Sequence, residues 1–361
     1  MFEQLDTMAT ERSEIRVGII GLGNIGQYHA ERLLDHGVTL VGGVDIVESA
    51  RKRFASRYDV EVYDRSEPLF ESADAVVVTT PNEFHEPYAV NALEDDVHVL
   101  LEKPLANSVE SGERIVRAAT ESEAVCMVGF NNRFSNTVEY VVHRIQRGEF
   151  GRVSHVEANY VRRRGVPGRG TWFTHRKAAG GGALIDLGVH AIDLSLYVLG
   201  FPPLSEASGV TRSEFGRRED YTYLEMWGND AGPSAFDVED SASAFVRTDD
   251  DRTISLEVAW ATNRPATHEF VVHGTEAAAR FDLLENDLTV HTASTGGPNA
   301  LEDTSVRTRD VDTHKLEQAV FLDAIEGETK AVTNVEEALA VQKVVDAVYR
   351  SNEAGRSVSI S

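Results

Sequence analysis

The chain of 361 residues is 42% hydrophobic and 26% charged, proportions typical of a globular protein with more than one hydrophobic core. Its formal net charge of −24 disfavours nucleic acids and anionic membranes as partners, because their phosphate groups would be repelled. The single cysteine, Cys126, excludes an internal disulfide framework and a cysteine-built zinc site. We expect a cytoplasmic protein that acts on a small molecule without a metal.

Six of the 35 basic residues are lysines. A surface rich in carboxylates and poor in lysine stays hydrated in concentrated salt, where screening removes its self-repulsion, so we expect a halophilic protein. The polar, acidic N-terminus predicts a flexible tail over 1–14. No apolar run has the ~18 residues that a membrane-spanning helix needs.

Apolar strands and helical patterns alternate after this tail. Strands are expected at 15–20, 38–45, 73–80, 97–104 and 124–129, and helices at 25–37, 46–58, 86–95 and 109–122. Such alternation predicts a parallel, doubly wound sheet with crossover helices on both faces. We therefore expect an α/β fold that opens with a Rossmann-type nucleotide-binding domain over 15–130.

The pattern changes in the second domain, 131–361. Helices are expected at 136–148, 183–200, 313–327 and 334–354, and alternating strands at 153–163, 241–248, 252–262, 267–274 and 277–284. These segments predict an α/β domain built on a large, open, mostly antiparallel sheet of five or more strands.

The sequence Gly21-Leu22-Gly23-Asn24-Ile25-Gly26 joins the first strand to the first helix and fits the G-x-G-x-x-G pattern. Gly21 permits the tight turn, Gly23 lets the backbone approach a pyrophosphate, and Gly26 lets the helix pack on the strand. The N–H groups of the helix start, including those of Asn24 and Ile25, would hold the phosphates. The alternatives are a ligand-free turn and the glycine-rich turn of a methyltransferase.

Asp45 ends the second strand, about 20 residues beyond the turn, where a carboxylate accepts hydrogen bonds from a ribose 2′-OH. The same carboxylate would repel a 2′-phosphate, so the sequence favours NAD. Arg51 and Arg53 follow within two helical turns and leave NADP possible.

The segment Thr79–His85 ends the strand at 73–80 at the carboxyl edge of the sheet, where ligands bind in this architecture. Thr80, Pro81 and Asn82 are therefore candidate cofactor contacts, and Asn82 could also cap the next helix. For His85 we favour a structural role under the cofactor loop over catalysis.

The strand at 97–104 runs directly into Glu102-Lys103-Pro104. Burying a Lys and a Glu at a sheet edge is costly unless they pair or act chemically. Pro104 fixes the backbone and could be cis, which would aim Lys103 at a ligand. We expect Glu102 and Lys103 in the cofactor site; a surface salt bridge is the alternative.

Three glycines, 180–182, precede the apolar helix at 183–200 and could lie against a flat ring. On this helix Asp186 and His190 are spaced i, i+4 and share a face, with Asp193 three residues further. A carboxylate beside an imidazole fixes the tautomer of a base that works near neutral pH. The alternative is a hydrogen-bonded pair in the core.

In this order, G-x-G-x-x-G, T-x-P-N-x-x-H, E-K-P and G-G-G-x-x-x-D-x-G-x-H-x-x-D resemble the Gfo/Idh/MocA family from about residue 15 to the end. The resemblance implies NAD(P)-dependent oxidation of sugars or cyclitols, with Lys103, Asp186 and His190 as catalytic and substrate-contacting residues. It also implies a homodimer or homotetramer formed through the C-terminal sheet.

Further substrate contacts are expected at Asn132 and Arg133. The sequence there departs from the G-F-x-R-R-[FY] pattern that is frequent in the family, since Asn132 replaces the first arginine. Trp172 lies in the polar loop 160–177, which could select a sugar ring; an oligomer contact or a flexible lid is the alternative.

Together these features predict that His190 removes a hydroxyl proton while Asp186 orients it and Lys103 stabilises the alkoxide. Two other functions stay open. One is a glycoside-cleaving enzyme that uses NAD transiently; the other is a non-catalytic NAD-binding regulator.

Overall fold

The structure is a computed structural model that describes residues 12, 14–224, 226, 228–294 and 296–360. The predicted tail, 1–14, lies outside the described residues except for Arg12 and Glu14. Arg12 forms ion pairs with Asp323 and Glu326. Contacts divide the chain into two compact units: the first comprises residues up to Phe134 with Asp312–Leu339, and the second Ser135–Val311 with Ala340–Ser361.

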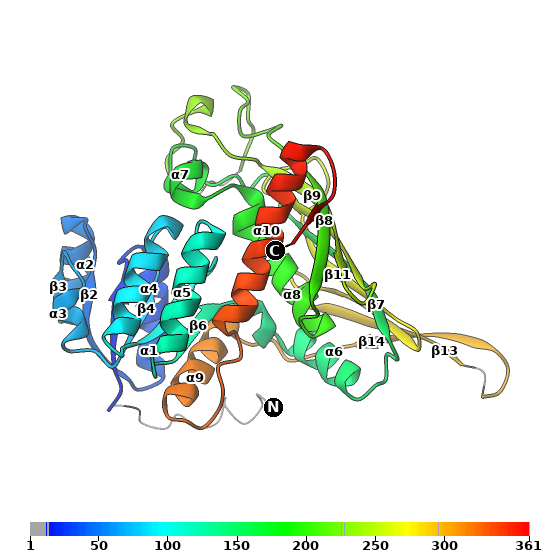
Figure 1. Cartoon of the computed structure of the whole chain (residues 1–361), viewed down its shortest axis with the longest axis horizontal. Helices are drawn as coiled ribbons and strands as arrows, with labels where there is room; N and C mark the ends of the chain where they lie inside the picture. Colours follow the sequence, from blue (N-terminus) through cyan, green and yellow to red (C-terminus); the bar gives the residue numbers. More distant parts are fainter. Residues whose placement is uncertain (1–11, 13, 225, 227, 295, 361) are drawn as a thin grey trace. The chain divides into compact units, whose positions relative to one another are not determined.

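The first unit is built on a parallel sheet, as predicted (Figure 1). In spatial order its six described strands are β3 (Glu61–Tyr63), β2 (Thr39–Val44), β1 (Arg16–Ile20), β4 (Ala75–Val78), β5 (His98–Glu102) and β6 (Cys126–Gly129). The strand order reverses between β1 and β4, and right-handed crossovers place helices on opposite faces on either side of this point. Ligands bind at such a switch point in open α/β sheets.

The first unit also contains helices. They are α1 (Asn24–Asp35), α2 (Glu48–Tyr58), α3 (Glu67–Phe70), α4 (His85–Glu94), α5 (Val109–Glu121), α9 (Thr313–Ile325) and the first turns of α10 (Val335–Ala354). The short β3 and α3 were not predicted, because three or four residues carry no periodic pattern. Gly37, with φ of +77°, follows the end of α1 as expected for a helix stop.

The segment 312–339 packs with the first unit, although the sequence suggested it as part of the second domain. Helix α9 contacts α1 and β6, and Val128 N–H donates to the Thr333 carbonyl at 2.9 Å. The division at residues 130 and 131 stays a prediction.

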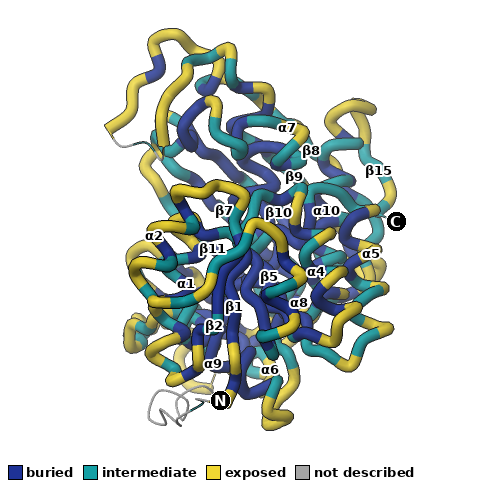
Figure 2. Tube along the Cα trace, turned by 90° about the vertical axis from the view of Figure 1, so that its left-hand side faces the viewer, coloured by how far each residue is buried: buried dark blue, intermediate teal, exposed yellow. Residues whose placement is uncertain are grey.

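The core of the first unit lies along β1 and β4. Val17, Ile19 and Ile20 are fully buried, as are all four residues of β4, and Figure 2 shows β1 dark blue over most of its length. Strands covered on both faces need apolar side chains at successive positions, which explains the continuous runs in the sequence.

The second unit contains the predicted open sheet, which has nine described strands and is antiparallel except for the β7–β10 pair (Figure 1). In spatial order these are β14 (Ala300–Val306), β13 (Asp287–Ser294), β12 (Ala277–Asp282), β11 (Thr267–Gly274), β7 (Val153–Val161), β10 (Thr253–Ala259), β9 (Ser241–Thr248), β8 (Leu204–Arg212) and β15 (Val358–Ser359). Of these, β8, β13, β14 and β15 were not predicted.

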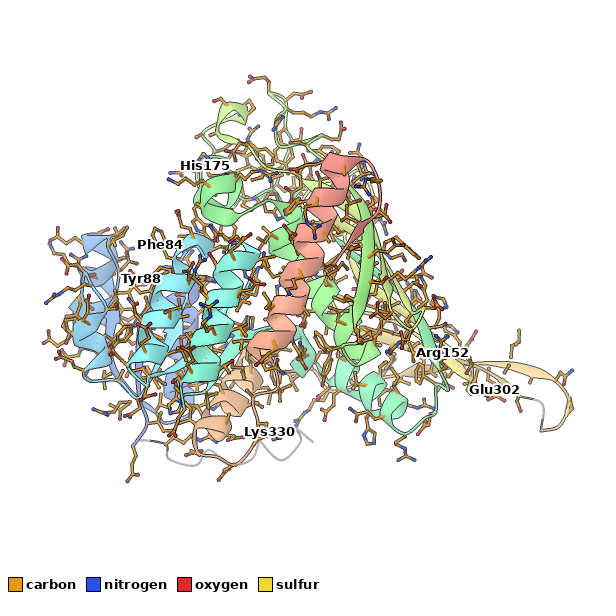
Figure 3. The ribbon with its side chains drawn as sticks, in the orientation of Figure 1. Phe84, Tyr88, Arg152, His175, Glu302 and Lys330 are labelled. Carbon is orange, nitrogen blue, oxygen red and sulfur yellow. The ribbon has the colours of Figure 1, made fainter. Side chains whose placement is uncertain are left out.

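The helices of this unit are α6 (Asn136–Gln146), α7 (Arg176–Ala179), α8 (Val189–Leu199) and the last part of α10. Helix α8 packs on β7 and β10 and is buried on nearly every side. Six of the seven residues of β14 are exposed, among them Glu302, labelled in Figure 3.

The stretch Arg176–Leu199 corrects one expectation from the sequence. Its 24 residues are long and apolar enough to cross a membrane by length and composition alone. However, 89% of its most apolar window is buried inside the protein, which is typical of the core helix of a folded domain.

Candidate cofactor and active site

The glycine turn between β1 and α1 has a conformation that requires its glycines. Gly21 has φ of +96°, which L side chains rarely adopt. A Cβ on Gly26 would lie 2.0 Å from the Gly21 carbonyl oxygen, whereas a Cβ on Gly23 would meet nothing within 4 Å. Gly26 therefore allows the tight turn, and Gly23 faces open space where a ligand could approach the backbone.

The first N–H groups of α1 are suited to bind an anion. The residue before the helix, Gly23, offers no side chain to cap them, so they receive no side-chain hydrogen bond there. Ile25 is 51% exposed at the same end. A helix N-terminus with uncapped amides and an exposed apolar side chain fits a dinucleotide pyrophosphate. Gly21, Gly23, Asn24 and Ile25 would hold this part of the cofactor.

Asp45 lies against the glycine turn. Its Oδ2 accepts a hydrogen bond from Leu22 N at 2.9 Å, and its Oδ1 accepts one from Val47 N at 2.8 Å. Arg51 donates to the Asp45 carbonyl oxygen at 2.6 Å, which keeps this guanidinium beside the end of β2. Both oxygens of the carboxylate are therefore held in a fixed orientation beside the glycine turn.

Two aromatic residues at the start of α4 escaped the sequence analysis. Phe84 is 40% exposed, and Tyr88 follows one turn later (Figure 3). Burial raises the pKa of Tyr88, with further increases from the charges of Asp45 and Glu67. Tyr88 therefore lies within electrostatic range of Asp45.

His85 connects two loops at the carboxyl edge of the sheet. Its Nδ1 lies 2.8 Å from the Pro104 carbonyl oxygen and its Nε2 lies 3.0 Å from the Thr80 carbonyl oxygen. Burial lowers the pKa of His85, so a neutral imidazole donates to one carbonyl at a time. These contacts support a structural role. Asn82, at 4% exposure, is buried in the same turn.

Glu102 belongs to a buried hydrogen-bond chain that the sequence did not reveal. Its Oε1 lies 2.8 Å from His29 Nε2, and His29 Nδ1 lies 2.8 Å from Gln318 Nε2 on α9. Burial alone would raise the pKa of the Glu102 carboxyl, but the hydrogen bond and charge of His29, with smaller contributions from other cations, lower it to about 2. His29 and Gln318 are 289 residues apart, so no local pattern could have predicted this contact.

Lys103 follows directly. Its peptide N–H donates to Glu102 Oε2 at 3.1 Å, and the Lys103–Pro104 peptide bond is cis, as the sequence suggested. The side chain is half-buried, while Leu105 beyond it is buried. Both the catalytic role and the salt-bridge alternative stay predictions.

Of the two residues expected to contact substrate from the first unit, Asn132 is half-buried and Arg133 lies in the core. Arg133 donates to Glu337 Oε2 at 2.5 Å and to the Val332 carbonyl at 2.9 Å. Its side chain is fully buried. These bonds use the guanidinium to fasten the start of α10, a structural role that the sequence did not suggest.

In the second unit, the helix that carries Asp186 and His190 starts with a π-helical turn, Leu184–Gly188, before α8 begins. Turns of this kind are rare in proteins, and those that occur often lie at functional sites. Asp186 is 7% exposed and its Oδ2 accepts a hydrogen bond from Trp260 Nε1 at 2.8 Å. Trp260 is thus a partner that the sequence analysis missed, and the predicted orientation of His190 by Asp186 stays a prediction.

His190 lies in an aromatic stack. The rings of His190 and Tyr160 have centroids 5.8 Å apart and are inclined by 16°, and Tyr160 stacks in turn on His268 at 3.7 Å. Burial and the charge of Arg162 lower the pKa of His268 to about 4, so its ring is neutral near pH 7. The stack holds an imidazole against a flat, uncharged surface.

The glycines before this helix have a structural cause. A Cβ on Gly181 would lie 1.9 Å from Tyr349 Oη, and one on Gly182 would lie 1.9 Å from the Glu239 carbonyl oxygen. Glu239 Oε1 accepts hydrogen bonds from Gly182 N, Leu184 N and Tyr349 Oη at 2.8, 3.0 and 2.8 Å. Burial raises the pKa of this carboxyl. Glu239 therefore caps the helix that carries Asp186.

Trp172 lies in the loop that the sequence proposed for substrate selection. Its ring is half-buried and stacks on Phe173, with centroids 3.8 Å apart.

One group of described acidic residues has oxygen atoms within 4.8 Å of one another: Asp323, Glu326 and Glu328. Arg12 pairs with two of these carboxylates, so a cation already lies among them.

Comparison with known proteins identifies the class that this fold and turn define: an oxidoreductase with an NAD-binding Rossmann domain. Residues 15–130 match the oxidoreductase family with the NAD-binding Rossmann fold, and residues 138–280 match the Gfo/Idh/MocA C-terminal domain. The chain belongs to the Gfo/Idh/MocA oxidoreductase family, as the motifs predicted.

Similar proteins span most of the chain. D-glucoside 3-dehydrogenase of Escherichia coli (strain K12) is 26% identical over 98% of this chain and 99% of its own. A putative oxidoreductase subunit of UDP-kanosamine synthase from Amycolatopsis mediterranei (strain S699) is 32% identical. The match covers 74% of this chain and 75% of that protein. The crystal structure of GenD2 from gentamicin A biosynthesis in complex with NAD has 26% identity and a TM-score of 0.78, over 98% of both chains.

Proposed function

We propose that this protein is an NAD-dependent dehydrogenase that oxidises a secondary hydroxyl group of a sugar or cyclitol. The observation that carries the proposal is the glycine turn, whose Leu22 N–H donates a hydrogen bond to Asp45. Among the proteins similar to this chain is a D-glucoside 3-dehydrogenase. Lys103, Asp186 and His190 form the proposed catalytic set.

In this proposal NAD, when bound, supplies the hydride acceptor. His190, whose half-buried ring stacks on Tyr160, accepts the proton of the substrate hydroxyl group. Asp186, whose Oδ2 accepts a hydrogen bond from Trp260 Nε1, orients the His190 imidazole. The Lys103 ammonium group stabilises the negative charge that develops on the substrate oxygen. The proposal requires both side chains to reach the same hydroxyl group.

Preference for NAD over NADP is part of the proposal. Two backbone N–H groups hold the Asp45 carboxylate in place. Its negative charge would accept hydrogen bonds from a ribose 2′-OH and repel a 2′-phosphate. Arg51 donates a hydrogen bond to the Asp45 carbonyl oxygen and is a cation beside this carboxylate that could accept a 2′-phosphate. Thr80, Pro81, Asn82 and Glu102 would complete the cofactor contacts.

We also propose a halophilic, cytoplasmic homodimer or homotetramer that associates through the open sheet. The edge strand β14 and its neighbour β13 carry few buried residues in the described chain. Light scattering coupled to size-exclusion chromatography tests the oligomeric state. A monomer at all salt concentrations would refute the proposed dimer or tetramer.

A redox glycoside-cleaving enzyme is the second candidate function, since the same residues could oxidise a sugar transiently. Incubation of the protein with NAD and a panel of inositols, aldoses and glycosides separates the two. A dehydrogenase accumulates one NADH per oxidised product, measured by absorbance. Cleavage of a glycoside without NADH accumulation would instead establish the second function. If no member of the panel changed NAD or substrate while NAD bound, the regulator alternative would hold.

A further inference from the structure

Two loops of the second unit fold together around a buried arginine. Arg169, 4% exposed, forms a bidentate ion pair with Asp230, with both distances 2.7 Å. It also donates to the carbonyl oxygens of Gly216 and Arg218 at 3.2 and 2.7 Å. The loop after β7 is therefore tied to the long connection between β8 and β9 by charge-assisted bonds, which are among the stronger hydrogen bonds in proteins.

A second buried charge holds the same connection. Asp240, fully buried, accepts hydrogen bonds from the N–H groups of Glu214, Phe215 and Gly216 at 3.2, 2.6 and 2.8 Å. These bonds fix the backbone at Phe215. Hydrogen bonds to two buried charged side chains therefore hold the two loops in a defined conformation, although they lie outside the regular sheet.

Between these loops lies a cavity of about 610 Å³. Its described lining residues are Arg163, Arg164, Thr222, Tyr223 and Leu224. A volume of this size is in the range of small-molecule sites.

Arg164 is preorganised in this cavity. Its guanidinium donates to the carbonyl oxygens of Arg163 and Thr262 and to Asn263 Oδ1, and it lies over the Phe215 ring at 4.7 Å from the centroid. All of these partners are uncharged, so the positive charge of Arg164 is not neutralised by them.

Arg163, on the exposed side, has no ion pair with any carboxylate in the described part of the chain, and the same is true of Arg164. Among the described residues, two adjacent arginines without an ion pair are unusual in a protein of net charge −24. The overall field repels anions, so an anionic ligand needs a local positive site of this kind.

The cavity also offers an aromatic face. Tyr223 is 39% exposed and stacks on Tyr221, with ring centroids 5.8 Å apart and an angle of 25°. The Tyr221 hydroxyl group accepts a hydrogen bond from Val166 N at 3.4 Å, which ties this ring pair to the first loop. An exposed tyrosine face suits the apolar face of a sugar ring.

We propose that this cavity binds an anionic sugar, with Arg163 and Arg164 on its carboxylate or phosphate group and Tyr223 against its ring. Arg163 follows Tyr160, which stacks on His190, by three residues, a span of at most about 11 Å in extended chain. The inference deepens the proposed function, on which it rests, by naming the substrate class.

Isothermal titration calorimetry of the NAD-loaded full chain at one fixed KCl concentration tests the proposal. The probes are D-glucose, D-glucuronate and D-glucose 6-phosphate, so the two charged arms distinguish carboxylate from phosphate. We expect at least one charged probe to bind about tenfold or more tightly than D-glucose. R163Q should reduce this preference to threefold or less, and Y223A should weaken all three probes.

R356Q is the matched control, because Arg356 is exposed and lies far from the cavity in sequence; it should keep the wild-type preference. Equal affinity for charged and neutral probes, or an undiminished preference in R163Q, would overturn the inference. Binding is measured without turnover, so failure of the proposed function would appear separately, as unchanged rates in Lys103 or His190 variants.

Discussion

Glu102 lies one residue before the proposed catalytic Lys103, and its carboxylate contacts both His29 Nε2 and the Lys103 peptide N–H. Glu239 has the same relation to the other half of the proposed site, because it caps the turn that leads to Asp186. Neither acid needs to touch substrate for its loss to matter. Each accepts hydrogen bonds from the backbone beside a proposed catalytic residue. Single substitutions at these acids should therefore lower the stability of the segments that carry the proposed site.

E102Q should destabilise the protein at neutral pH. The folded-state pKa of Glu102 is about 2, below the ordinary value of 4.5, so its ionised form stabilises the fold above pH 4.5, and this contribution is lost as the pH falls through 2. The shift corresponds to roughly 3 kcal/mol in the free energy of unfolding. Urea unfolding of wild type and E102Q at pH 7 and near pH 3 checks this. A difference between the two proteins that does not shrink at the lower pH would contradict it.

G182A should destabilise the second unit, because the new Cβ would lie 1.9 Å from the Glu239 carbonyl oxygen and the backbone must move. We expect a loss of roughly 1–3 kcal/mol in the free energy of unfolding. Thermal unfolding measures it. The control is G297A, at a glycine where a Cβ meets nothing within 4 Å; equal melting temperatures for the two variants would show that the contact has no weight.

At the scale of elements, the junction of β1 and α1 combines three requirements in six residues. Gly21 takes a positive φ, Gly26 admits the close turn, and Leu22 N is held by Asp45 at the end of β2. The carboxylate that would select the cofactor therefore also shapes the turn. A substitution that removes only the charge separates these two roles.

D45N keeps one oxygen that can accept from Leu22 N, loses the hydrogen bond from Val47 N and removes the negative charge. We expect the protein to fold and kcat/KM for NADP, relative to NAD, to rise about tenfold or more, because the 2′-phosphate is no longer repelled. Initial rates with each cofactor measure the ratio. D64N, at an exposed carboxylate, should leave it unchanged. An unaltered ratio in D45N would mean that Asp45 does not select the cofactor.

The elements that could be predicted are those whose pattern is local. β9 and β11 occupy the predicted residues, 241–248 and 267–274, because their side chains alternate between a buried and a half-exposed face. β14 could not be predicted, since nearly all its residues are exposed and its sequence shows no alternation of buried and exposed positions. The glycine turn could be found as a motif.

The supporting contacts of the site could not be predicted. Trp260 reaches Asp186 across 74 positions and Gln318 reaches His29 across 289. No periodic signal connects residues so far apart in the chain. For Arg133, a motif suggested a substrate contact, which stays a prediction; the structure adds an ion pair between its buried guanidinium and Glu337 that the motif did not suggest.

At the scale of the whole molecule, the net charge of −24 opposes folding through self-repulsion at low salt. Screening at about 1 M salt reduces the Debye length to roughly 3 Å. The free energy of unfolding should therefore rise with KCl concentration, whereas sucrose at the same osmolality should give a smaller gain. Urea unfolding in the two series measures this, and a stability that falls or stays constant with KCl would contradict a salt-adapted surface.

The central claim is that Lys103 and His190 act on one substrate hydroxyl group beside a bound nicotinamide. It is tested most directly by comparing K103M and H190A with the wild type on a substrate that the panel identifies, with NAD affinity measured in parallel by calorimetry. The account predicts that kcat falls by about 10² or more in each variant while the Kd for NAD changes less than about threefold. Near-wild-type turnover in either variant, with NAD still bound, would contradict it.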